Sequence, residues 1–71
     1  MANFVKLTNN SPNFKGNPLY INIDHIVTVY EEQDEDGMFH TKLYGGFDKI
    51  VWDVEEPISK VINIFYETKK D

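Results

Sequence analysis

The chain has 71 residues, a formal net charge of −5 and no cysteine, and 41% of its residues are apolar. A chain of this length has room for one hydrophobic core and not for two, so we expect a single domain over 1–71. Small domains bury little apolar surface and are usually reinforced by a disulfide, a metal or a partner subunit. The lack of cysteine excludes the first of these.

Two features of the sequence favour a cytoplasmic protein. A secreted domain of this size usually carries disulfides, and this chain has no cysteine. The chain becomes polar soon after its first few residues. This start contains neither the apolar stretch of a signal peptide nor the roughly 20 apolar residues of a membrane helix. We therefore expect a cytoplasmic protein that does not insert into a membrane.

The negative charge is concentrated in one segment. Of the twelve acidic residues, five lie within six positions and the other seven balance the seven lysines. The chain has no arginine, the residue that reads guanine edges and clamps phosphates with a planar fork. The composition therefore disfavours sequence-specific recognition of nucleic acid and predicts one acidic projection on a balanced body.

The first half of the chain alternates in the manner of β-strands. We expect strands at 3–8 and 19–23, separated by a loop over 9–18 that is rich in Asn and Pro. Residues 26–30 have high strand propensity, so the stretch 19–30 predicts two strands, or one bent strand, interrupted at Asp24-His25.

The second half predicts a hairpin, a last strand and a helix. The run EEQDEDG ends in a turn dipeptide and is followed by an extended pattern at 38–44, which indicates a hairpin with an acidic tip. Gly45-Gly46 predicts a tight turn into a strand over 47–54. From Pro57 to about Lys69 the apolar period becomes that of an amphipathic helix, with a stripe made of Ile58, Val61, Ile62 and Phe65.

The predicted fold is α+β, a small antiparallel sheet of four or five strands with one C-terminal helix packed on one face, in the order β-β-β-β-β-α. Because one helix covers only one face, strand alternation divides the apolar residues into two sets. The set expected beneath the helix is Val5, Leu7, Leu19, Ile21, Ile23, Val27, Val29, Phe39, Leu43, Ile50, Trp52 and Val54. The opposite face is expected to carry Phe4, Tyr20, Tyr30, Met38, Tyr44, Phe47 and Val51, among lysines and His40.

Three hypotheses remain open for this second face. In the first, the face is an ordinary solvated surface. In the second, it binds another copy of the chain or a protein partner. In the third, nucleic acid bases stack on its rings between the lysines. Tyr, Phe and Met are enriched in interface cores, which favours the second hypothesis.

No residue pattern indicates catalysis. The two histidines, His25 and His40, have no metal-binding spacing, and the serines lie in no nucleophile context. The acids at 32, 34 and 36 resemble the first half of a calcium loop, but Leu43 stands where a bidentate Glu is required. We expect no enzymatic activity, no cofactor and no metal.

Four segments together resemble a known family: Val5–Thr8, Tyr20–Ile26, Lys42–Gly46 and Val54–Ile58. Their order is similar to that of the small flagellar FlbD/SwrD-like proteins, and the resemblance covers nearly the whole chain. It implies a non-enzymatic accessory protein that acts by contact with other proteins, and it carries over no catalytic residue.

We therefore expect an interaction module that forms homo-oligomers and binds a protein partner of unknown identity. The residues expected at the contact are Tyr20, Tyr30, Tyr44, Phe47 and Trp52, together with the acidic residues Glu31, Glu32, Asp34, Glu35 and Asp36. The alternative is an accessory protein of a phage or mobile element. Such a protein would bind nucleic acid through the aromatic and lysine-bearing sheet face, or inhibit an enzyme by presenting the acidic hairpin as a phosphate mimic.

Overall fold

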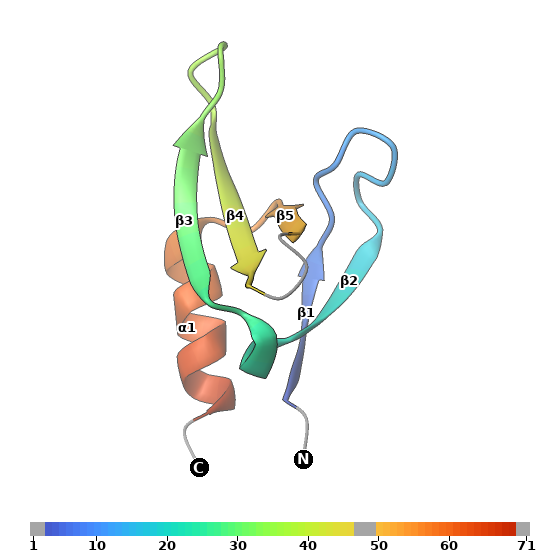
Figure 1. Ribbon diagram of the computed structural model, residues 1–71. Helices are drawn as coiled ribbons and strands as arrows, with labels where there is room; N and C mark the ends of the chain where they lie inside the picture. Colours follow the sequence, from blue (N-terminus) through green and yellow to red (C-terminus); the bar gives the residue numbers. More distant parts are fainter. Residues whose placement is uncertain (1–2, 47–49, 70–71) are drawn as a thin grey trace.

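The computed structural model describes residues 3–46 and 50–69, and over these residues it contains five strands, a short 3₁₀ turn and one α-helix (Figure 1). In chain order the elements are β1 (Phe4–Thr8), β2 (Pro18–Asn22), η1 (Ile23–His25), β3 (Thr28–Gln33), β4 (Phe39–Gly45), β5 (Ile50–Val54) and α1 (Ile58–Thr68). All paired strands are antiparallel, so the α+β class and the C-terminal helix are confirmed. The predicted start of the last strand, at 47–49, lies outside the described residues.

The strands form two sheets, where we expected one. β1 pairs with β2, and a second sheet has the order β3-β4-β5. The reason is the η1 turn at Ile23–His25, which separates β2 from β3 and redirects the chain, so that the two strands diverge in Figure 1. Within the described residues, one isolated bridge, Asn9 opposite Val54, connects the two sheets.

The sheets are joined where the chain runs on past β1 beside β5. The Asn10 N–H donates to the Asp53 carbonyl at 2.8 Å, and the Glu55 N–H donates to the Thr8 carbonyl at 2.9 Å. The Glu56 carboxylate accepts from the Thr8 N–H at 3.0 Å and from the Thr8 hydroxyl at 2.9 Å. We call these contacts the β1–β5 junction. It connects the start of the chain to the segment that leads into α1.

The hydrophobic core lies between the inner faces of the two sheets and α1, which contacts both β1 and β3. Its buried members are Val5, Leu7, Ile21, Ile23, Leu43, Val54 and Val61. The sheet members all belong to the set expected beneath the helix, and Val61 belongs to the expected helix stripe. Alternation therefore predicted the centre of the core correctly.

Four residues expected in the core are instead exposed: Val27, Phe39, Ile50 and Ile62. Phe39 lies beyond Thr41, the last β4 residue that pairs with β5, so the sheet does not extend over it. Ile50 stands opposite Gly45, which offers no side chain to pack against.

The other two exposures have separate causes. Val27 precedes β3, in the connection from η1, where the alternation of the strand has not begun. Ile62 follows the fully buried Val61 by one residue, and a rotation of about 100° per residue carries it to the flank of α1.

Replacing Glu56 with Gln should destabilise the fold. The change removes the charge from the junction contacts with Thr8, and hydrogen bonds to charged groups contribute about 1.5 kcal/mol or more when partly buried. Urea unfolding measures the loss. Glu55→Gln is the matched control, because the backbone of Glu55 and not its side chain contacts Thr8. Equal stability of the two variants would contradict this role of Glu56.

Candidate protein-contact site

The β3–β4 hairpin projects beyond the rest of its sheet. β5 accompanies β4 only as far as Thr41, whereas β3 stays paired with β4 up to Gln33 opposite Phe39. In Figure 1 the hairpin tip therefore stands clear of the body, at one end of a molecule that measures 39 × 24 × 21 Å.

Asp34 organises the turn at this tip. Its Oδ1 accepts from the backbone N–H of Asp36 and of Met38, each at 2.9 Å. Gly37 has φ +84°, a left-handed conformation that glycine adopts without steric cost, and its N–H donates to the Asp34 carbonyl. The predicted acidic hairpin is confirmed, and one of its five acids is engaged in holding the turn.

His40 connects this turn to the body of the protein. Its Nε2 lies 2.7 Å from Asp34 Oδ2, and its Nδ1 lies 3.2 Å from Asp53 Oδ2 on β5. The Asn10 side-chain amide lies 3.2 Å from the same Nδ1 and donates to Asp53 Oδ1 at 3.3 Å. We call the group of His40, Asp34, Asp53 and Asn10 the His40 clamp. It links the hairpin tip to β5 and to the loop after β1.

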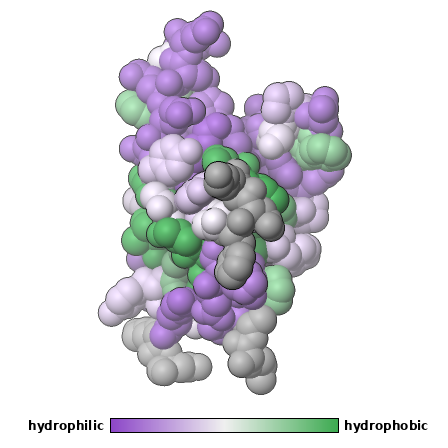
Figure 2. All heavy atoms as spheres, in the orientation of Figure 1, coloured by the Kyte–Doolittle hydropathy of each residue, from purple (hydrophilic) through white to green (hydrophobic). Residues whose placement is uncertain are grey.

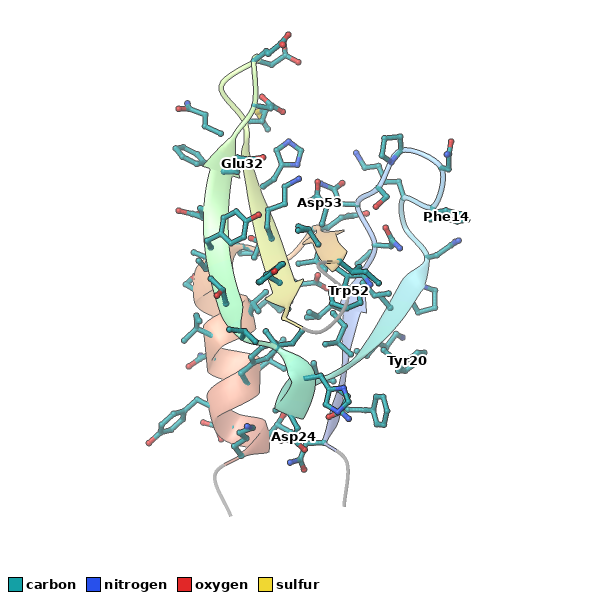
Figure 3. All side chains as sticks on the ribbon, in the orientation of Figure 1. Phe14, Tyr20, Asp24, Glu32, Trp52 and Asp53 are labelled. Atoms are coloured by element: carbon teal, nitrogen blue, oxygen red, sulfur yellow. The ribbon has the colours of Figure 1, made fainter. Side chains whose placement is uncertain are left out.

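Two more charged residues extend the clamp along the outer face of the sheet. Lys42 Nζ lies 3.3 Å from Asp53 Oδ2 and 3.8 Å from Glu32 Oε1. In Figure 3, Glu32 lies near the hairpin end of β3, and Asp53 lies beside the hairpin lower in the molecule. Glu32, His40, Lys42 and Asp53 therefore form a connected network of ion pairs on the outer face of this sheet.

The ionisation of the clamp follows from these contacts. The Asp34 carboxylate raises the pKa of His40 above its ordinary 6.5, and Asp53 adds to this effect. The same contact with His40, helped by the Met38 N–H, lowers the pKa of Asp34 below 3.8. A protonated His40 donates to both carboxylates. A neutral His40 donates from one nitrogen only and can accept the Asn10 amide on the other.

Beside the clamp lies a groove of about 380 Å³ between the hairpin and the loop that connects β1 to β2. Its lining is formed by Asn10, Lys15, Asp34, Met38, Phe39, His40 and Glu55. Met38 and Phe39 are each 65% exposed, and Glu31, Glu35 and Asp36 are exposed near them. Figure 2 shows the hairpin as mostly hydrophilic with a small hydrophobic area on its flank. This hairpin end thus offers an apolar centre bordered by carboxylates.

The structure does not bring the predicted aromatic contact residues onto one surface. Tyr30 and Tyr44 are half-buried on the outer face of the three-stranded sheet, whereas Tyr20 is 64% exposed on β2, in the other sheet. Trp52 is half-buried and packs against the core, in the centre of Figure 3, while Tyr20 points outward. Phe47 lies outside the described residues. The five predicted acids, Glu31, Glu32, Asp34, Glu35 and Asp36, do lie together at the hairpin.

Sequence reasoning missed the clamp and the exposed pair Met38 and Phe39. Alternation already placed His40 on the outer face, but the approach of Asp53 depends on the β4–β5 register, and that of Asn10 depends on the β1–β5 junction. Neither distance has a local sequence signal.

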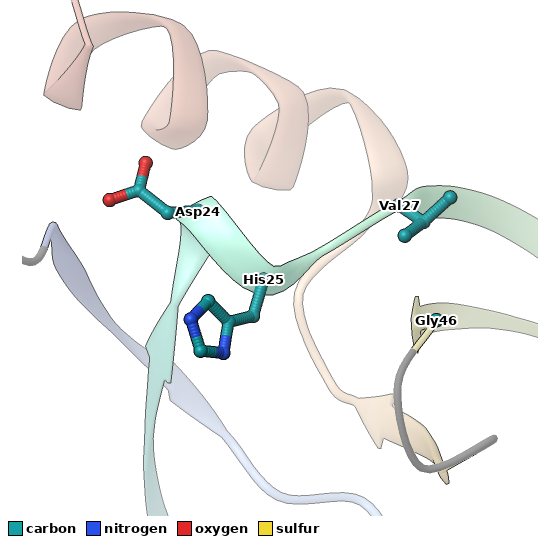
Figure 4. Close-up of a pocket in the computed structure, with 4 residues that line it drawn as sticks. All are labelled: Asp24, His25, Val27 and Gly46. Carbon is teal, nitrogen blue, oxygen red and sulfur yellow. The ribbon is translucent and has the colours of Figure 1, made fainter.

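A second pocket, of about 400 Å³, is lined by Asp24, His25, Val27 and Gly46 (Figure 4). The Asp24 carboxylate points toward α1, where its Oδ1 lies 3.2 Å from Lys69 Nζ, and the His25 ring points the other way. The two side chains do not converge, so they do not form an acid–base pair. Among the residues the structure describes, no cluster of three or more His, Cys, Asp and Glu side chains is placed to hold a metal ion.

Comparison of the chain with protein-family models, curated proteins and solved structures gives no match. In the part of the chain that the structure describes, no helix has the length and apolar character needed to cross a membrane. The fold is that of a small α+β domain, and its function must be inferred from its own surface.

The contribution of the clamp to stability should depend on pH. The pKa of His40 is raised by folding, so its contribution is complete below 6.5 and is lost as the pH rises through the folded pKa. The pKa of Asp34 is lowered, so its contribution is complete above 3.8 and is lost as the pH falls through the folded pKa. Both contributions are therefore complete between 3.8 and 6.5.

Urea unfolding of wild type and His40→Gln at about pH 5 and about pH 8.5 tests this dependence. The variant should lose more stability relative to wild type at the lower pH. An NMR titration of the His40 ring measures its pKa directly. An equal loss at both pH values would show that the clamp is not proton-linked.

Proposed function

We propose that this protein is a non-enzymatic interaction module that binds a basic, partly apolar surface of a protein partner through the end of the β3–β4 hairpin. The observation that carries the proposal is the exposure of Met38 and Phe39, 65% each, among the carboxylates of a projecting hairpin. We also propose that the protein acts in the cytoplasm, on the ground of its cysteine-free sequence.

Three properties of the hairpin support this function. Phe and Met are enriched at the buried centre of protein interfaces, where they supply apolar contact area. The exposed carboxylates of Glu31, Glu35 and Asp36 attract a positively charged surface and accelerate its approach. The His40 clamp fixes the hairpin before binding, which reduces the entropy lost when a partner orders it.

A contact function of this kind is also what the resemblance to the flagellar accessory family implies. The ion pairs at two of the pockets support it rather than catalysis, because they tie three of the carboxylates near these pockets into structural contacts. Asp24 is paired with Lys69, and Asp34 and Asp53 are paired with His40.

Affinity capture on the immobilised full chain tests the proposal. The double variant Met38→Ser, Phe39→Ser should lose the proteins that wild type retains, because it removes the apolar centre of the contact. The matched control is Val51→Ser, Ile62→Ser, which removes exposed apolar side chains at other sites. Retention by the control and loss by the hairpin variant is the expected result. Retention of the same proteins by the hairpin variant would contradict the proposal.

A further inference from the structure

The chain itself carries a surface that complements the hairpin. The sequence contains no Asp or Glu before Asp24, so β1, β2 and the loop between them carry lysines without any carboxylate. The outer face of the β1–β2 pair presents Phe4, Lys6 and Tyr20, with Lys6 opposite Tyr20 and Phe4 at the next position along that face. We call these three residues the ribbon face.

The ribbon face is exposed and its charge is not neutralised. Phe4 is 60% exposed and Tyr20 is 64% exposed. Within the described residues Lys6 forms no ion pair, and the first acid of the chain, Asp24, is engaged by Lys69 at 3.2 Å. A lysine between two exposed rings matches, in charge and in apolar character, a hairpin end that carries carboxylates and two exposed apolar side chains.

We propose that the ribbon face receives the hairpin end of a second copy of the chain, so that copies associate head to tail. This inference rests on the proposed function of the hairpin and names a partner for it. Met38 and Phe39 of one copy contact the Phe4 and Tyr20 rings of the next, and the carboxylates of Glu35 and Asp36 approach Lys6. Oppositely charged, apolar-centred patches on one chain provide both halves of the contact.

The contact forms between copies and not within one. In Figure 3 the Tyr20 side chain points outward from β2, far from Glu32 at the hairpin end, and the His40 clamp holds the hairpin to Asp53 and Asn10. Because the two patches differ, a single contact leaves one unused patch on each copy. The association then extends into rings or open chains, or closes as a two-fold pair in which each hairpin contacts the ribbon face of the other copy. The patches comprise only a few side chains each, whereas a standard stable interface involves roughly 20–30 residues a side, so we expect weak, salt-sensitive association.

Complementation between two variants tests the inference. The ribbon variant Lys6→Ser, Tyr20→Ser keeps its hairpin, and the hairpin variant Glu35→Lys, Asp36→Lys keeps its ribbon face. Sedimentation velocity should show self-association of wild type. The association constant of each variant alone should be lower by a factor of about ten or more. An equimolar mixture should recover association but stop at the dimer, because each variant retains one working patch. Lys60→Glu, an exposed change on α1 outside both patches, should associate as wild type does.

Other outcomes would overturn the inference. A wild-type chain that stays monomeric, or a mixture that stays monomeric, would exclude the head-to-tail contact. If a short single-stranded oligothymidylate bound wild type but not the ribbon variant while the mixture stayed monomeric, the ribbon face would serve nucleic acid instead. If the mixture did not associate but Met38→Ser, Phe39→Ser still lost a captured protein, the proposed function of the hairpin would stand. Only the inference that its partner is a second copy of the chain would be wrong.

Discussion

The β1–β5 junction holds the two sheets of this small domain together. After η1 the two sheets diverge, and the hydrogen bonds of Asn10 with Asp53 and of Thr8 with Glu55 and Glu56 bring them back together. The Glu56 contact also fixes the segment that precedes α1, so that Val61 reaches the core between both sheets. A small chain thereby encloses one core with two short sheets and a single helix.

The same junction positions the candidate site. Once the backbone of Asn10 is bonded to that of Asp53, both side chains lie within reach of His40, and His40 holds the tip through Asp34. The hairpin extends beyond β5 and cannot be held by apolar packing. Polar contacts replace burial there, and Met38 and Phe39 remain exposed as a consequence. The His40 clamp and the proposed contact surface thus have one cause: the β3–β4 hairpin extends further than β5, the strand beside β4.

Much of the candidate site was accessible from the sequence, but its organisation was not. The acidic run and its Asp36-Gly37 turn are local features, and the hairpin carries them as predicted. The aromatic residues were treated as one face because alternation assigns parity within a sheet. Parity cannot reveal that Tyr20 belongs to one sheet and Tyr30 and Tyr44 to another. The tyrosines expected on one contact surface therefore lie on two different sheets, Tyr20 on one and Tyr30 and Tyr44 on the other.

The strands, the helix, their order and most of the core follow from the sequence, because hydrophobic periods of 2 and 3.6 residues are properties of neighbouring residues. The division of the strands into sheets, the apolar residues that lie past the end of β5 and the partners of His40 are set by the folded chain as a whole. These depend on the register between distant segments, such as Lys42 opposite Asp53, and on the direction that the chain takes after η1. Register and direction come from the packing of the whole chain and are not encoded in any one stretch of it.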